Sequence, residues 1–238
     1  MKLIAGTGLN LTSVAPGDLD GADRLMAHWA EIECSHVEIS ARRLDVVLGG
    51  KLNMPATKRV AAMIDRHGMA PVLHAPHGIN LMDRDRRDMH LGAAEASIEF
   101  CRITGCKSMV MHSGNVSLTE WIYDRDALLA EERDLLKRLG DLAEKADVNL
   151  SVENLIAHGA NPHRMPYGAD PQALAAQLAE TDHPRVGACL DFGHAWLSAT
   201  TLGFDFIPAI AALSPYVWHL HLHDNFCLLY TSPSPRDP

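Results

Sequence analysis

Short runs of apolar and β-branched residues alternate with longer amphipathic segments along the chain. The short runs have the length of buried strands, whereas the longer segments repeat apolar residues at helical spacing. This alternation is typical of repeated βα units around a parallel sheet. We therefore expect strands at residues 2–8, 36–40, 70–74, 108–112, 149–153, 186–191 and 217–221.

The segments between these strands predict helices that pack one face on the sheet. In the longest segment, Leu128, Leu135 and Leu139 follow helical spacing, with charged residues between them. Asp18 and Asp170 each precede a predicted helix and suit the N-cap position. The expected helices occupy residues 19–33, 56–67, 86–104, 125–146, 171–180 and, for a shorter one, 204–212.

Seven such repeats in one domain indicate a (β/α)8 TIM-type barrel of which about seven strands are present, rather than a doubly wound open sheet. A dinucleotide site is also disfavoured, because Leu11 stands where the third glycine of a G-x-G-x-x-G pattern is required. The predicted fold class is thus an incomplete α/β barrel.

Residues 1–225 are expected to form one barrel domain that lacks its last βα unit. Residues 226–238 read FCLLYTSPSPRDP and are rich in serine and proline where the pattern requires a helix. We interpret this segment as a non-native or disordered tail, because CLLYTSPSPRDP resembles translated sequencing-adapter read-through. A natural flexible terminus is the alternative.

Composition narrows the possible classes of function. A chain of 238 residues with 47% hydrophobic content can bury one large core. The net charge of -9 and the lack of long Lys/Arg runs argue against an extended nucleic-acid surface. The five cysteines include no C-x-x-C pair, and no apolar run reaches the length of a membrane span or signal segment. We therefore expect a cytoplasmic protein with neither a membrane nor a nucleic-acid partner.

Carboxylates and imidazoles gather where the expected strands end. In TIM-type barrels the active site lies at the carboxyl ends of the strands. Glu153 and Asp191 are informative there, because a carboxylate inside a buried strand is costly unless it is paired or bound to a metal. Oxygen and nitrogen donors together are what a catalytic divalent cation requires. The strand-end residues are Glu38, His74, His77, His112, Glu153, Asp191, His194, His219, His221, His223 and Asp224.

Five motifs in order, LHAPHGINL, VMHSG, SVENL, CLDFGHAW and HLHLHD, resemble the xylose-isomerase-like TIM barrel superfamily. That superfamily includes sugar phosphate isomerases and epimerases and also endonuclease IV. The resemblance implies that Glu153, Asp191 and His221 bind a divalent ion such as manganese, magnesium, cobalt or zinc. His221 is the first residue of an H-x-x-D pattern that ends at Asp224. It also implies a fourth ligand, a glutamate on the eighth strand, which we expect this chain to lack.

The same resemblance implies further roles. His74 and His112 match positions that bind an additional zinc in endonuclease IV, and His194 matches a position that contacts substrate in the sugar enzymes or a further zinc in the endonucleases. For each of the weaker candidates for substrate contact, a purely structural role is the alternative, such as ion pairing, core packing or capping of a loop. They are Glu38, His77, Asn154, Trp196 and His219.

The expected activity is isomerisation or epimerisation of a small sugar or sugar phosphate. Proton transfer would pass through a metal-stabilised enediolate, with Glu153 as one acid/base group. An endonuclease IV-like zinc phosphodiesterase acting on abasic DNA, an inositol-type dehydratase and a non-catalytic sugar-binding barrel remain alternatives. A homo-oligomer is possible, and we expect the full-length parent to be the enzyme while this chain is weak or inactive.

Overall fold

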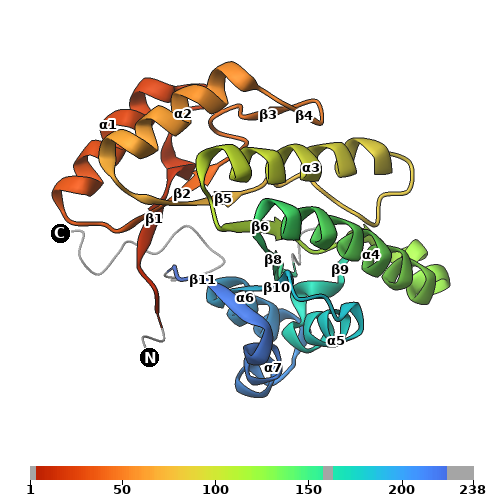
Figure 1. The fold of residues 1–238 in the computed structure, drawn as a ribbon. Helices are drawn as coiled ribbons and strands as arrows, with labels where there is room; N and C mark the ends of the chain where they lie inside the picture. The colour runs from red at the N-terminus through yellow and green to blue at the C-terminus, as the bar shows by residue number, and fades with distance from the viewer. Residues whose placement is uncertain (1–3, 158–162, 224–238) are drawn as a thin grey trace.

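The computed structural model describes residues 4–157 and 163–223, and its centre is a seven-stranded parallel sheet. The strand order is β1-β2-β5-β6-β8-β10-β11, so chain order and spatial order agree. The sheet curls, and the helices follow one another around its outer side (Figure 1). This is the architecture of a (β/α)8 barrel in incomplete form.

The six later strands of the sheet have the bounds that the sequence predicts. The first strand does not: it begins at Gly8, although the pattern predicts residues 2–8. Residues 2 and 3 of that prediction lie outside the described range. Thr7 donates its N–H to the Ser35 hydroxyl at 3.2 Å, although its carbonyl accepts the His36 N–H at 3.2 Å, so its contact with the neighbouring segment is only partly that of a strand. The sheet strands are β1 (Gly8–Asn10), β2 (His36–Ser40), β5 (Ala70–His74), β6 (Ser108–His112), β8 (Asn149–Glu153), β10 (Val186–Asp191) and β11 (Val217–His221).

Local sequence explains where several helices begin and end. The fourth helix begins at Leu118 rather than at residue 125, because Ser117 and Glu120 form a capping box. Asp18 and Asp170 cap their helices as expected. The helices are α1 (Leu19–Glu31), α2 (Met54–His67), α3 (Arg87–Thr104), α4 (Leu118–Ala146), α5 (Pro171–Thr181), α6 (Phe192–Leu202), which the pattern does not predict, and α7 (Phe206–Leu213).

Two short antiparallel pairs accompany the main sheet. β3 (Val47–Leu48) pairs with β4 (Lys51–Leu52), and β7 (Asn115–Ser117) pairs with β9 (Arg164–Pro166). The second pair follows the ends of β6 and β8 along the chain. It therefore lies at the end of the barrel where an active site is expected.

The core has two parts. Most buried apolar side chains form one cluster that includes both sheet and helix residues, whereas Val72, Val110 and Cys189 form a separate small cluster of three strand residues.

The strand order ends at β1 and β11, and neither has a second strand partner among the described residues. Trp218 and Leu220 on β11 are accordingly 44% and 42% exposed. No helix in the described ranges has both the length and the apolar character needed to cross a membrane.

A buried carboxylate on α4 ties the loop after β6 to the helices. Glu132 accepts a hydrogen bond from the Gly114 N–H at 2.8 Å and another from Nε2 of Gln177 at 3.0 Å. Burial raises the pKa of Glu132, although the hydrogen bonds around it oppose that shift. Glu132 therefore fixes the chain just beyond His112 to both α4 and α5.

Replacing Glu132 with alanine should destabilise the fold, because it leaves two buried donors without an acceptor. Each such donor costs about 1–3 kcal/mol, so the Glu132→Ala variant should lose about 2–6 kcal/mol of unfolding free energy in urea denaturation. A loss below about 0.5 kcal/mol, the range of an ordinary surface substitution, would show that this tie contributes little.

The Glu132→Gln variant separates charge from hydrogen bonding. Because the pKa of Glu132 is raised on folding, the folded chain keeps its proton at a pH where the unfolded chain has lost it. Wild-type stability relative to Glu132→Gln should therefore fall as the pH rises above 4.5, the ordinary pKa of the group. A difference that is constant with pH would contradict this reading.

Candidate active site

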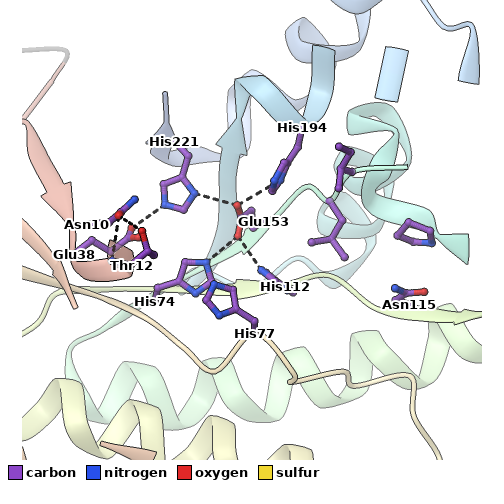
Figure 2. A pocket seen from close by; sticks show the side chains of 13 residues that line it. Asn10, Thr12, Glu38, His74, His77, His112, Asn115, Glu153, His194 and His221 are labelled. Carbon is purple, nitrogen blue, oxygen red and sulfur yellow. Dashed lines mark hydrogen bonds and ion pairs between the residues drawn. The ribbon is translucent and has the colours of Figure 1, made fainter. Parts of the chain in front are cut away.

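A pocket of about 420 Å³ opens at the carboxyl ends of the strands. Its lining comes from segments distributed over most of the chain, and polar side chains make up most of it (Figure 2). The lining residues are Asn10, Thr12, Glu38, His74, His77, His112, Asn115, Glu153, Leu155, Ile156, Pro166, His194 and His221.

Glu153, the last residue of β8, lies at the centre of the polar group, and it is 2% exposed (Figure 2). Its Oε2 atom is 3.2 Å from Nε2 of His74 and 3.4 Å from Nε2 of His112. Its Oε1 atom is 3.0 Å from Nδ1 of His221 and 3.6 Å from Nδ1 of His194. Four imidazoles from separate segments thus surround one carboxylate.

Glu38, on β2, is the second buried carboxylate of the pocket. Its Oε2 lies 2.8 Å from Nε2 of His221 and 3.3 Å from Nε2 of His219. Burial opposes its charge, but hydrogen bonds from these two imidazoles hold the pKa of Glu38 well below its usual range. The pKa of Glu153 is also held low, because the histidines around it, His112 first, outweigh the effect of burial. Both carboxyl groups are therefore ionised at neutral pH.

Asp191 ends β10 and caps α6 by accepting the backbone N–H of His194 at 2.7 Å. Its two carboxylate oxygens lie 3.0 and 3.2 Å from Nε2 of His223. Asn154, the residue after β8, makes two hydrogen bonds to the Asp191 backbone. Its Nδ2 donates to the Asp191 carbonyl at 3.0 Å, and its Oδ1 accepts the Asp191 N–H at 2.7 Å. These two hydrogen bonds keep the ends of β8 and β10 at a fixed separation.

The contacts of His74 indicate that positive charge lies between its ring and Glu153. Its Nδ1 lies 2.9 Å from the Ala75 carbonyl, which can only accept, so Nδ1 carries a proton. Its Nε2 faces an oxygen of Glu153. A lone pair on Nε2 would repel the lone pairs of that oxygen unless a proton or a cation lies between the two atoms. Burial opposes protonation of His74, but the Glu153 contact outweighs it and raises the pKa of His74.

His221 lies between two carboxylates, with Nδ1 toward Glu153 and Nε2 toward Glu38. Burial opposes its charge, but Cys189 and the two carboxylates outweigh burial and raise the pKa of His221 above its usual range. Burial also raises the pKa of Cys189 to about 12, so the thiol is neutral. The carboxylates are therefore the negative charges that His221 balances.

His77 differs from the other imidazoles of the pocket. Burial, together with the neighbouring His74 and His112, lowers the pKa of His77 to about 4. The ring is therefore neutral at pH 7, and its buried Nδ1 has no hydrogen-bond partner among the described residues. His77 therefore contributes an uncharged imidazole to the pocket lining.

The donor set fits a divalent cation. Glu153, Asp191 and His221 each offer a ligand atom, and these atoms lie within 4.8 Å of one another. In the described ranges, the ion-pair partners of Glu38, Glu153 and Asp191 are all histidines, with no lysine or arginine. Two carboxylates with an imidazole and no competing basic side chain can accommodate Mn²⁺, Mg²⁺, Co²⁺ or Zn²⁺.

Most of the residues that the sequence singles out lie together, but three of the candidates for substrate contact do not line the pocket. Asn154 is fully buried, and its side chain is bound to the Asp191 backbone. His219 contacts Glu38 and does not line the pocket. Trp196 is 54% exposed on α6 and packs edge-on against Phe206, with ring centroids 5.4 Å apart. Asp224, the predicted end of the H-x-x-D pattern, falls outside the described residues.

Three polar residues of the lining were not predicted from the sequence: Asn10, Thr12 and Asn115. The first two were missed because the predicted first strand ends at Gly8, whereas β1 continues to Asn10. Asn115 lies three residues beyond the predicted strand end at His112 and pairs with Pro166 in the β7–β9 pair, which the sequence pattern does not reveal. The strand-end rule could have found Asn10 with the correct boundary.

The fold and this pocket define a (β/α)-barrel protein with a carboxylate–imidazole site at the carboxyl ends of its strands. The chain belongs to the xylose isomerase-like TIM barrel family, whose profile matches residues 27–230. No curated protein sequence matches the chain.

Solved structures with the same fold include several sugar epimerases. A D-tagatose 3-epimerase-like protein aligns with a TM-score of 0.70 at 18% identity, covering 92% of this chain and 76% of that one. The 3-keto-D-glucoside 4-epimerase of E. coli aligns with a TM-score of 0.69 at 17% identity, covering 92% and 79%. Endonuclease IV from Thermus thermophilus aligns with a TM-score of 0.58 at 19% identity, covering 89% and 72%.

Divalent cations should stabilise the folded chain through this pocket. A cation that binds only the folded state at about 100 times its dissociation constant adds about 2.7 kcal/mol of stability. Titration with Mn²⁺ or Co²⁺ should therefore raise the Tm of the wild type, and Asp191→Asn should remove most of that rise. Asp126→Asn, at a side chain that is 92% exposed, serves as the matched control. An equal rise in Tm for wild type and Asp191→Asn would place the ion elsewhere.

Proposed function

We propose that the chain is a divalent-metal-dependent isomerase or epimerase of a small sugar or sugar phosphate. The observation that carries this proposal is the approach of Glu153, Asp191 and His221, whose ligand atoms lie within 4.8 Å of one another at the pocket. A cation bound there would polarise the substrate carbonyl and favour an enediolate. The named epimerases that share the fold support the assignment.

Glu153 is the residue that we assign to the carbon-bound proton. It lines the pocket, and its two oxygens are held in place by His74, His112 and His221. Its low pKa makes it a weak base in water, so close and fixed placement against the substrate must supply the rate. Asp191 and His221 complete the set that would hold the cation.

The rest of the lining suits a sugar. The pocket volume of about 420 Å³ falls in the range of small-molecule sites, about 300–1,000 Å³. His77 offers a neutral imidazole nitrogen, and Asn10 and Asn115 offer amide groups for hydroxyls. Leu155 and Ile156 add apolar surface, which suits the C–H face of a ring.

A zinc phosphodiesterase of the endonuclease IV kind is the second candidate. The contacts of His74 and His112 with Glu153 favour it, because they provide nitrogen donors for a further ion beside the first site. The net charge of -9 argues against an extended DNA-binding surface. An inositol-type dehydratase would use the same pocket and belongs to the sugar-enzyme class.

The test is a substrate screen with metal dependence. The chain, and the same chain extended by the last βα unit of a related barrel, would be assayed with Mn²⁺ or Co²⁺ against ketoses, pentose and hexose phosphates, inositols and abasic-site DNA. We expect epimerisation or isomerisation of a sugar, with exchange of the carbon-bound proton into solvent. Glu153→Gln should lower kcat by at least about 100-fold, the range of general acid–base catalysis.

The exposed Glu144→Gln variant is the control for loss of a glutamate charge, and it should retain wild-type turnover. Metal-dependent cleavage of abasic DNA without sugar turnover would replace the proposal by the second candidate. Absence of turnover in both forms of the chain, despite bound cation, would leave a non-catalytic binding barrel.

A further inference from the structure

Glu38 reaches across the barrel to a strand that is not its neighbour in the sheet. It lies on β2, whereas its partner His221 lies on β11, at the opposite end of the strand order. The contact joins residues 183 positions apart at 2.8 Å, and Glu38 is 9% exposed. A buried ionised carboxylate is costly unless it is paired and hydrogen-bonded, so this long-range contact needs a reason.

The two nitrogens of His221 divide between two environments. Nδ1 lies 3.0 Å from Glu153 and 3.7 Å from Asp191, whereas Nε2 lies 2.8 Å from Glu38. A neutral imidazole has one N–H and one lone pair, and a carboxylate can only accept. Glu153 and Glu38 both only accept, so without a cation both nitrogens of His221 carry a proton. A cation held by Glu153 and Asp191 would replace the proton on Nδ1, and Glu38 would then keep the remaining proton on Nε2.

We propose that Glu38 is a positioning residue that holds His221 by its Nε2–H, so that Nδ1 is presented as a ligand to the cation held by Glu153 and Asp191. This inference rests on the proposed function, because it assigns a role toward the same cation. Partners of this kind, beyond the ligands themselves, fix the orientation and tautomer of metal-binding histidines and raise their basicity.

His219 completes the arrangement from the same strand as His221. Its Nε2 lies 3.3 Å from the same Glu38 oxygen, Oε2, and the two imidazole rings are nearly perpendicular, at 88°, with centroids 5.1 Å apart. A hydrogen bond from His221 and the close approach of His219 to the same oxygen restrict the rotation of the Glu38 carboxylate. The residue therefore has little freedom to turn toward a ligand, although it borders the pocket.

Two different roles of Glu38 would have different effects on binding. A substrate contact would affect the binding of sugar and leave the affinity for cation unchanged. A positioning residue would affect the affinity for cation before any sugar is added, because the His221 ring loses its fixed tautomer and orientation.

The experiment measures cation affinity on the full chain without substrate. Isothermal titration with Mn²⁺ should show a 10- to 100-fold weaker Kd for Glu38→Ala than for wild type, the usual range for loss of such a partner. Glu38→Gln keeps an oxygen acceptor of nearly the same shape but no charge, so it should fold like wild type and lose less affinity. Its smaller loss is the conservative rescue that distinguishes positioning from general damage to the fold.

A spectroscopic readout tests the tautomer itself. In Zn²⁺-loaded protein labelled with ¹⁵N-histidine, wild type should show His221 bound through Nδ1 with a slowly exchanging Nε2–H. That proton should exchange faster in Glu38→Ala. Asp23→Ala is the matched control, because it breaks another carboxylate–imidazole contact, 2.7 Å from Nε2 of His67, outside the pocket. It should leave both the Kd and the His221 signals unchanged.

The outcomes separate this inference from the proposed function. Wild-type Mn²⁺ affinity and unchanged His221 signals in both Glu38 variants would overturn the positioning role and leave the metal site intact. Unchanged affinity with a raised KM for sugar would make Glu38 a substrate contact instead. Failure of the wild-type chain to bind any of the cations would overturn both proposals.

Discussion

Concentrated negative charge at the carboxyl ends of the strands is the constraint around which the functional end of this protein is built. Glu38, Glu153 and Asp191 are at most 9% exposed, and their ion-pair partners in the described ranges are histidines alone. Isolated buried carboxylates would be prohibitively costly, so positive charge must accompany them as protons on imidazole or as a cation. Histidine is the side chain that permits either solution, because it exchanges a proton for a metal near neutral pH.

The barrel provides the framework that brings these groups together. Parallel strands in sequential order place every carboxyl end on one rim, so one polar residue per strand is enough to assemble a site. Fine placement comes from a second set of contacts. Asn154 fixes the ends of β8 and β10 through the Asp191 backbone, and Glu132 fixes the loop beyond β6. These tying residues lie outside the pocket lining, yet the separation of the lining side chains depends on them.

Much of this arrangement could be predicted from the sequence, because periodicity and strand ends are local properties. Six strands have the predicted bounds, and Glu153 and His221 lie at strand ends as the pattern requires. What could not be predicted depends on partners far apart in the chain. The first strand occupies Gly8–Asn10 and not the earlier residues that its pattern predicts, and this difference concealed Asn10. Trp196 packs on α7, and no local pattern indicates which face of an unpredicted helix is exposed.

The link between β2 and β11 has a consequence for how the protein acquires its site. Contacts between residues 183 positions apart form only after long loops have closed, and loop closure of this kind slows folding. No local segment of the chain contains all of the candidate ligands. The set is therefore complete only when β11, which carries His221, has docked. A ligand that binds only the completed rim therefore adds driving force to that final assembly step and leaves the earlier kinetics of the chain unchanged.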